Sequence, residues 1–348
     1  MTRAADRENL KFISHLEVAI HPLESLSTQL DVTYDWSYDH VRTDLRHLYE
    51  KAKRAQWVAD TQLPWDTDVD LDRQPLVEPM HPLFGSDLYA RLSETEKRRS
   101  AREIFTWILS QFMHGEQGAL FAAAQLVVAV PDTDSKLYAS TQVIDEGRHV
   151  EVYARYLHDK IGNSYPISPH LKKLLDLILT DSRWDMKLLG MQIMVEGLAL
   201  ASFGMIRQIV DEPLLRELIH HVMLDEARHV AFGVVSLRDH YREMKDADRR
   251  EREDFVYEAA VLMRDRFLYE PVWEKLGMPV DECVRVSRDS ESQKLFRQML
   301  FSKIVPALKK MELLTPSLRG RFEALGILQF EDWPDPFAAL ETDAPAAP

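Results

Sequence analysis

The chain has 348 residues, with 43 lysines and arginines against 57 aspartates and glutamates, so its formal net charge is -14. A general nucleic-acid binder needs a basic surface, and this balance argues against that class. The single cysteine, Cys283, rules out an internal disulfide and a cysteine-ligated zinc site. The longest apolar stretch, residues 119–130, is too short to span a bilayer. We therefore expect a cytoplasmic protein without a membrane span.

Helical periodicity dominates the chain from about residue 94, and strand patterns are scarce. Before that point we expect one helix, at residues 44–60, and a proline- and acid-rich surface loop at 61–85. The helices predicted after it, in chain order, are 94–130, 133–160, 171–180, 185–210, 213–244, 247–276 and 291–314. Pro131 ends the first of these, because proline cannot continue a helix.

These elements predict an all-α fold built around one four-helix bundle at residues 94–244. We expect residues 1–93 to pack on the bundle as a helix and a loop. Residues 245–337 should add further helices to it. Residues 338–348 are rich in alanine and proline, and we expect a disordered tail there.

Two strings with the pattern Asp-Glu-x-Arg-His stand out, at residues 145–149 and 225–229. Four fixed positions arise by chance about once in 10⁵ positions at average residue usage, so two copies in one chain are not accidental. Each string also follows a glutamate, Glu116 or Glu196, that lies 30 residues before the glutamate of the string. Every element of the first set thus recurs 80 residues later, which indicates a duplicated helical hairpin.

The spacing places the glutamates of each hairpin level with one another. Pro131 lies 15 residues after Glu116 and 15 before Glu146, so both lie about 22 Å from a turn at Pro131, at 1.5 Å per residue. The same relation holds in the second hairpin about Asp211. Glutamate and histidine three residues apart share a helix face. The side chains that should converge when the hairpins pack are Glu116, Glu146, His149, Glu196, Glu226 and His229.

Four buried carboxylates need compensating charge, because isolated buried charge is very costly. Two divalent metal ions would supply it, and carboxylate plus imidazole ligands suit iron or manganese and oxygen chemistry. We interpret the six side chains as metal ligands; the alternative is a metal-free bundle of buried ion pairs. Asp145 and Asp225 should hydrogen-bond the outer ring nitrogen of a ligand histidine from the opposite hairpin, and Arg148 and Arg228 should pair with those aspartates.

At these residues the chain resembles the ferritin-like di-iron carboxylate superfamily, over residues 94 to about 244. The resemblance implies a ferritin-like four-helix bundle in which two iron ions activate O₂, with a manganese–iron pair as the alternative. Roughly ninety residues precede the bundle and a hundred follow it, which favours an enzyme over an iron store. The lack of further cysteines argues against a rubrerythrin.

Two member families can be compared residue by residue. The p-aminobenzoate-type N-oxygenases are similar in size but carry a third histidine four residues before the second hairpin's glutamate; this chain has Val222 there, and His221 is one residue away. In ribonucleotide reductase small subunits a radical tyrosine follows the first ligand histidine by four residues, and Tyr153 stands at that distance from His149. Tyr153 is therefore a candidate catalytic residue, although a core aromatic is the simpler interpretation.

The resemblance implies an O₂-activating di-iron oxidase or oxygenase. We expect it to act on a small or medium apolar substrate, aromatic or aliphatic. No flavin or nicotinamide motif is visible, so electrons should come from an external reductase. We also expect a homodimer. The alternatives are a ferroxidase or iron-binding protein without an organic substrate, and a tyrosyl-radical generator.

In an up-down-down-up bundle, residues seven away from each glutamate also face inward, about 10 Å along the axis. Toward the Pro131 turn these residues are mostly small: Ala123, Ala139, Leu189 and Gly233. Toward the other end they are bulky: Leu109, Tyr153, Phe203 and Ile219. The small layer predicts an apolar substrate cavity beside the metals; the alternative is that flanking side chains fill it.

Overall fold

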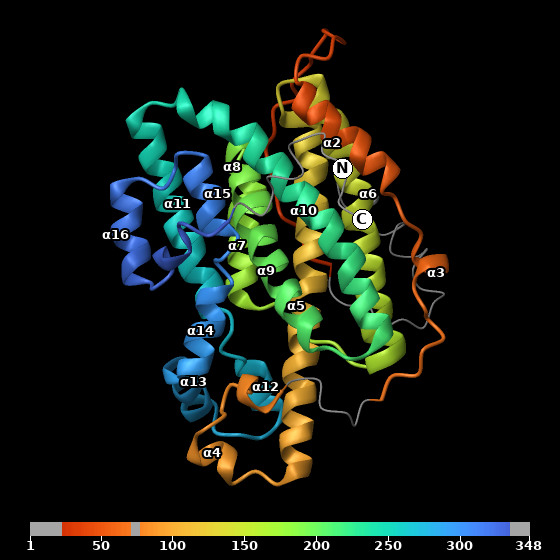
Figure 1. Ribbon diagram of the computed structural model, residues 1–348, viewed down its shortest axis with the longest axis vertical. Helices are drawn as coiled ribbons and strands as arrows, with labels where there is room; N and C mark the ends of the chain where they lie inside the picture. Colours follow the sequence, from red (N-terminus) through yellow and green to blue (C-terminus); the bar gives the residue numbers. More distant parts are fainter. Residues whose placement is uncertain (1–22, 71–76, 335–348) are drawn as a thin grey trace, which may run out of the picture.

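The computed structural model describes residues 23–70 and 77–334. Within them every regular element is helical, so the predicted all-α class is confirmed. Four long helical segments form the bundle (Figure 1). They are α5 (Glu94–Ala129), α6 (Thr133–Arg155) with its π-helical extension η2 (Tyr156–Ile161), the run α8 (Trp184–Leu188), η3 (Leu189–Val195) and α9 (Glu196–Ile209), and α10 (Pro213–Arg242).

The ends of these segments follow from local sequence. Ser93 and Glu96 form a capping box at the start of α5, and Asp132 caps α6 by accepting from the Ser135 N–H. The α10 helix begins at Pro213, whose missing N–H is harmless in the first turn. Gly162 ends η2 with φ of 69°, a left-handed conformation that glycine adopts without strain.

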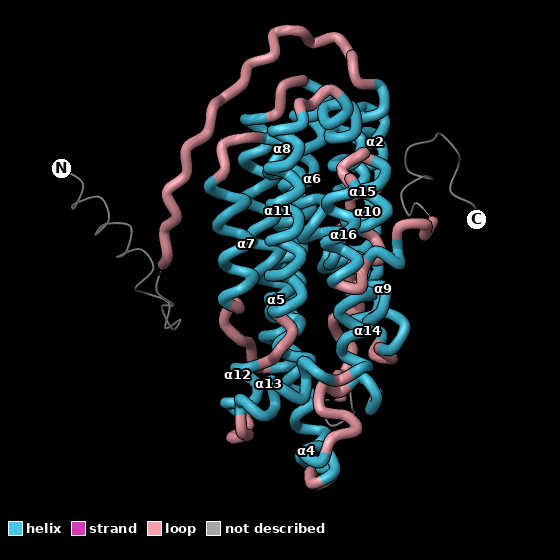
Figure 2. The backbone as a smooth tube through the Cα atoms, turned by 90° about the vertical axis from the view of Figure 1, so that its left-hand side faces the viewer, coloured by secondary structure: helices cyan, strands magenta, loops and turns pink. Residues whose placement is uncertain are grey.

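The two hairpin turns lie at opposite ends of the bundle (Figure 1). The long connection between the hairpins carries α7 (Pro169–Thr180), which runs beside α5 and α11 (Figure 2). This is the predicted up-down-down-up order. The third segment differs from the prediction in one respect, because η3 winds as a π-helix through the seven residues just before Glu196. Such turns shift the face on which side chains emerge.

Two predicted C-terminal helices are each broken in two. The segment 247–276 forms α11 (Asp246–Asp265) and α12 (Glu270–Lys275), and 291–314 forms α14 (Glu291–Met299) and α15 (Ile304–Lys310). The cause is visible in the sequence: Pro271 and Pro306 each lie in the first turn of the later helix, where proline is tolerated, rather than in a helix interior. Two helices were not predicted, α13 (Val280–Asp289) and α16 (Pro316–Ala324).

The N-terminal part covers one side of the bundle. The predicted helix at 44–60 is shorter, forming α2 (Thr43–Arg54) and then α3 (Ala59–Gln62) after an irregular link. The α2 helix packs on α6 and α10. Short turns follow in and after the predicted loop, namely η1 (Glu78–Met80) and α4 (Asp87–Ala90), and η4 (Leu328–Phe330) lies near the C-terminal end. The expectation for residues 338–348 falls outside the described residues.

One helical run, Trp184–Ile209, is long and apolar enough to cross a membrane by length and composition. However, 83% of its most apolar window is buried inside the protein. This run is the third segment of the bundle, and its apolar character is that of a core helix surrounded by other helices.

Candidate metal centre

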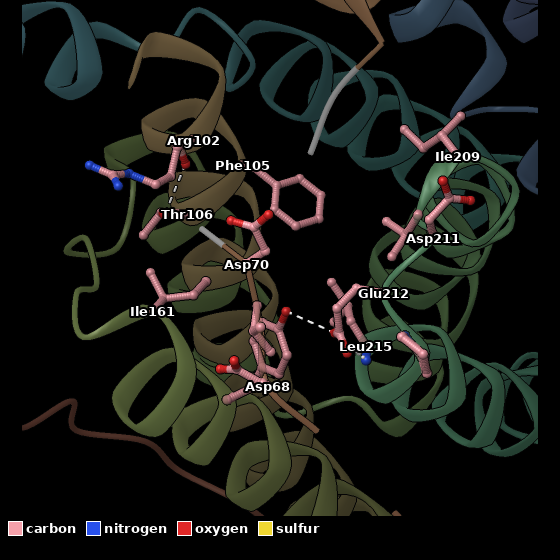
Figure 3. Close-up of a pocket in the computed structure, with 14 residues that line it drawn as sticks. Asp68, Asp70, Arg102, Phe105, Thr106, Ile161, Ile209, Asp211, Glu212 and Leu215 are labelled. Carbon is pink, nitrogen blue, oxygen red and sulfur yellow. Dashed lines mark hydrogen bonds between the residues drawn. The ribbon is translucent and has the colours of Figure 1, made fainter. Parts of the chain in front are cut away.

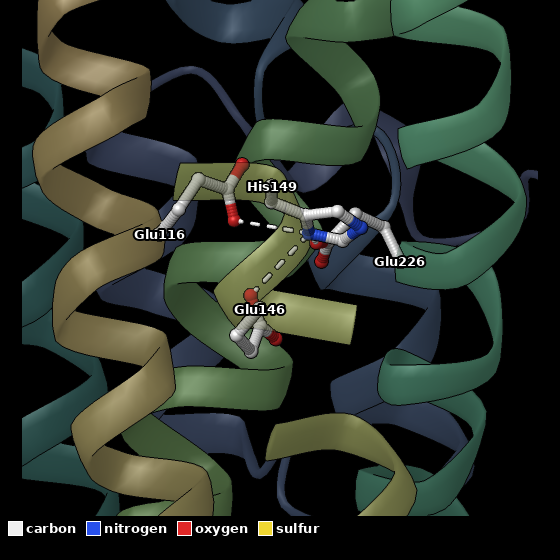
Figure 4. Close-up of side chains that lie close together, drawn as sticks. All are labelled: Glu116, Glu146, His149 and Glu226. Carbon is white, nitrogen blue, oxygen red and sulfur yellow. Dashed lines mark ion pairs between the residues drawn. The ribbon is translucent and has the colours of Figure 1, made fainter. Parts of the chain in front are cut away.

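The six predicted ligand side chains meet halfway along the bundle. Their nitrogen and oxygen atoms form two groups, and within each group the atoms lie within 4.8 Å of one another. The first group is Glu116, Glu146, His149 and Glu226 (Figure 4). The second is Glu146, Glu196, Glu226 and His229. Glu146 and Glu226 belong to both groups, so the arrangement has two places for an ion and two carboxylates shared between them.

The cluster is enclosed by protein. None of the six residues is more than 5% exposed. His149 Nδ1 lies 3.2 Å from an oxygen of Glu226, and His229 Nδ1 lies 3.1 Å from an oxygen of Glu146. Both imidazoles thus turn the Nδ1 atom toward the carboxylates and the Nε2 atom away from them.

Several of these buried atoms have no hydrogen-bond partner among the described residues. They are Glu146 Oε2, His149 Nδ1, Glu196 Oε2, both carboxylate oxygens of Glu226, and His229 Nδ1. Buried polar atoms are nearly always satisfied in folded proteins. A set of unsatisfied carboxylate oxygens and imidazole nitrogens that face one another is the donor set of a divalent metal site, and it fits two such ions.

The electrostatics of the cluster agree with this interpretation. Burial, together with the nearby carboxylate of Glu226, raises the pKa of Glu116 from 4.5 to about 8. Burial and the same neighbour raise the pKa of Glu196 well above its ordinary value. Without bound cations the carboxylates therefore resist ionising together, whereas divalent ions would hold them in the charged form.

Each histidine is held from behind by an aspartate of the other hairpin, as the spacing predicts. His149 Nε2 lies 3.1 Å from Asp225 Oδ2, and His229 Nε2 lies 3.2 Å from Asp145 Oδ2. Arg148 donates to both aspartates, and Arg228 donates to Asp225. These contacts fix the orientation of each ring and leave Nδ1 available as the ligand atom.

The structure adds two glutamines inside the bundle that the sequence interpretation did not include. Gln142 donates to Glu146 Oε1 at 3.0 Å and to Glu196 Oε1 at 2.9 Å, and Gln192 donates to Gln142. Both glutamines lie four residues before a glutamate of the set, on the same helix face. That spacing was a signal available in the sequence.

The segment after α2 supplies two more partners, on the outer side of the aspartates. Trp57 Nε1 donates to Asp225 Oδ2 at 2.7 Å. Gln56 donates to Asp145 Oδ1 at 2.8 Å and accepts from Arg148. No local pattern indicates these residues, because they lie about ninety or more positions from their partners.

Three other residues from the family comparison occupy distinct surroundings. Tyr153 is fully buried beside Phe203, and its hydroxyl has no partner among the described residues. Val222 is also fully buried, and its side chain offers no ligand atom. His221 stacks on Trp57 with ring centroids 4.7 Å apart and does not join the carboxylate cluster.

The cavity expected beside the metals is absent at Gly233, so this part of the prediction is wrong. A Cβ atom at Gly233 would lie only 2.8 Å from the Cβ of Gln192 and 3.1 Å from Ile193. Both neighbours belong to η3, whose π-helical winding carries their side chains against α10. Ala123, Ala139 and Leu189 are fully buried, and an open space beside them stays a prediction.

Comparison with known proteins places this centre in context. The family model described as p-aminobenzoate N-oxygenase AurF matches residues 39–312. An R2-like ligand-binding oxidase with an aerobically reconstituted Mn/Fe cofactor is 18% identical, with a TM-score of 0.51, over 80% of this chain and 95% of that one. A variant of an R2-like ligand-binding oxidase, also 18% identical, gives 0.51 over 78% and 94%. These two likenesses show the fold. No curated protein matches the chain.

Proposed function

Because the chain belongs to the p-aminobenzoate N-oxygenase family, we propose that this oxidoreductase is an O₂-dependent oxygenase with two bound metal ions. Two irons are the proposed pair, with manganese and iron as the alternative. The proposed substrate is a small or medium apolar molecule, aromatic or aliphatic. The observation that carries the proposal is the buried set of unsatisfied carboxylate and imidazole atoms.

The two groups of side chains divide the ligands between the ions. Glu116 and His149 would bind one ion, and Glu196 and His229 the other. Glu146 and Glu226 would bridge them, since both belong to the two groups. When bound, such a pair of ions supplies the redox chemistry of O₂, which protein side chains alone lack.

The remaining residues of the centre orient its ligands and exclude water. Asp225 and Asp145 accept from the outer ring nitrogens, which keeps the proton on Nε2 and leaves Nδ1 free to bind. Arg148 and Arg228 balance the charge of these aspartates inside the bundle. Gln142 holds Glu146 and Glu196 in register by donating to both.

The family description names oxygenation of an aromatic amine, and that reaction is one candidate for this chain. The departure at position 222 separates the two cases, because this chain offers four glutamates and two histidines with no third imidazole at that position. Hydroxylation or desaturation of an apolar substrate is therefore the second candidate. We also propose an external electron donor, for which the net charge of -14 suits a basic partner protein, and a homodimeric assembly in the cytoplasm.

Metal analysis after anaerobic loading with ferrous iron, followed by O₂ uptake, tests this function. We expect two ions per chain and O₂ consumption that an apolar amine or hydrocarbon stimulates. Accumulation of many irons per chain would instead identify an iron store. A stable tyrosyl signal in electron paramagnetic resonance without product would identify a radical generator. Loading that leaves the protein without metal would contradict the assignment.

A further inference from the structure

A pocket of about 870 Å³ opens at the end of the bundle opposite the α5–α6 turn (Figure 3). All four bundle segments line it: Phe105 of α5, Tyr156 of η2, Val210 after α9 and Leu215 of α10. Figure 3 shows Phe105 and Ile161 on one side of the space and Ile209 and Leu215 on the other. A pocket bordered by every segment lies at the end of the bundle axis.

The same axis passes through the metal centre. Phe105 lies 11 residues before Glu116, and Leu215 lies 11 before Glu226. Tyr156 lies 10 residues after Glu146. At 1.5 Å per residue the lining is about 15–17 Å from the level of the glutamates. The space between holds one layer of inward-facing side chains.

We call this the barrier layer, and it consists of Leu109, Phe112, Tyr153, Phe203 and Ile219. None of these residues is more than 3% exposed. Phe203 is its centre, with ring centroids 4.7 Å from Phe112 and 6.1 Å from Tyr153. The layer contacts solvent-exposed space on neither side, so the centre and the pocket are separated by side chains only.

The barrier layer contains one polar atom that its packing does not satisfy. The hydroxyl of Tyr153 is fully buried and has no hydrogen-bond partner among the described residues. A buried hydroxyl without a partner costs free energy. A polar group of a molecule passing through the layer, or bound beside it, would supply the missing partner.

The pocket lining combines an apolar floor with carboxylates near its rim. Phe105, Ile161 and Leu215 provide apolar surface. Asp68, Asp70, Asp211 and Glu212 contribute carboxylates, and Arg102 is the single basic residue among the described residues that line it. Glu212 is partly occupied, because it caps α10 and accepts from the Tyr156 hydroxyl at 3.1 Å. The lining is therefore net negative, which disfavours anions.

We propose that this pocket is the entrance for the organic substrate and that the barrier layer is the gate between it and the metal centre. The inference rests on the proposed function and adds the substrate's class. The substrate is an elongated, largely apolar molecule whose polar end is uncharged or cationic. It enters along the bundle axis, and the side chains of the layer move aside to let its apolar end reach the metals.

Chelation of ferrous iron by 2,2′-bipyridyl measures access to the centre without any turnover. The experiment uses the reduced holoprotein, after metal analysis has shown two ions per chain; a protein without metal would already have failed the proposed function. Leu109→Ala opens the barrier layer, and we expect iron removal about tenfold faster than in the wild type. Ile209→Trp fills the pocket, and we expect removal to slow by about threefold or more.

Two matched variants control for general loosening of the bundle. Leu189 is as buried as Leu109 and also lies seven residues before a glutamate, but toward the other end of the axis. Leu189→Ala should therefore leave the rate within about twofold of the wild type. Ala124→Trp adds the same bulk on the exposed outer face of α5, in a different depression, and should also have no effect. Equal acceleration in the two leucine variants, or no slowing by Ile209→Trp, would overturn the route.

A charge-matched pair of chelators tests the substrate class. The uncharged 2,2′-bipyridyl should remove iron faster than its 4,4′-dicarboxylate. Asp68 is exposed at the pocket and lies outside the metal centre, so Asp68→Lys should reduce this preference by about threefold or more without changing the iron content. A preference that is unaltered in Asp68→Lys would contradict selection by the charge of this pocket.

Discussion

The Nε2 atom of His149 lies 3.1 Å from Oδ2 of Asp225, which belongs to the other helical hairpin. The reciprocal contact joins His229 to Asp145 at 3.2 Å. Each hairpin thus orients the histidine of its duplicate, so neither half of the centre is complete alone. The two hairpins are fixed against one another by the same contacts that prepare the metal ligands.

Removing one of these aspartates should weaken the centre without abolishing it. Asp225→Ala leaves His149 in place but without the acceptor that fixes its ring, so we expect metal affinity to fall by about tenfold to a hundredfold. Competition with a chelator of known affinity measures the change. Asp159→Ala is the control, because Asp159 is an exposed aspartate that pairs with His158 and Arg155. An unchanged affinity in Asp225→Ala would show that the contact has no part in metal binding.

Trp57 makes a separate prediction about stability. Its indole N–H donates to Asp225 Oδ2 at 2.7 Å, and the ring is 5% exposed. Trp57→Phe removes that donor while Asp225 still accepts from His149 and both arginines. We expect a loss of about 1–3 kcal/mol in the free energy of unfolding, measured by urea denaturation of the metal-free protein. Trp36→Phe should change little, since the side chain of Trp36 is 74% exposed.

The metal ligands could be predicted because their spacing is a local property. A glutamate and a histidine three residues apart share a face on any α-helix, and equal distances from a turn align two helices. Gln56 and Trp57 could not be predicted in this way, because their partners are brought to them only by the packing of α2 on α6 and α10.

The substrate cavity was misplaced for a related reason. Counting in sevens assumes 3.6 residues per turn throughout, whereas η3 is a π-helix just before Glu196. Its winding brings Gln192 and Ile193 against Gly233, so the small residue there is a packing requirement rather than open space. The broken C-terminal helices differ from this case, since Pro271 and Pro306 marked the breaks in the sequence itself.

The stability of the metal-free protein should fall as pH rises. The pKa of Glu116 is raised by burial and by Glu226 from 4.5 to about 8, so the folded protein holds a proton that the unfolded chain releases above pH 4.5. The contribution of Glu116 is full below pH 4.5 and is lost by about pH 8, and Glu196 acts in the same direction. Thermal unfolding at pH 5.5 and 8 should show the decline, and Glu116→Gln should reduce it. A metal-free protein that gains stability over this range would refute the argument.

Glu226→Ala should abolish tight binding of at least one ion. Glu226 belongs to both ligand groups, and neither of its carboxylate oxygens has a hydrogen-bond partner among the described residues. Metal analysis should therefore find one ion or none per chain, with O₂ consumption lost. Glu217→Ala, on the exposed side of the same helix, should retain both ions. Two ions and full activity in Glu226→Ala would exclude Glu226 as a shared ligand.

Tyr153→Phe separates a redox role for this tyrosine from a packing role. The substitution removes only the hydroxyl, which has no partner among the described residues, and keeps the ring against Phe112 and Phe203. We expect both metal ions to be retained and the free energy of unfolding to be unchanged or slightly higher, because no hydrogen bond is lost. If turnover also persists, an essential tyrosyl radical is excluded and Tyr153 acts as part of the barrier layer. If turnover disappears while both ions stay bound, the hydroxyl takes part in the reaction, and electron paramagnetic resonance of the wild type should then show a tyrosyl signal that the variant lacks.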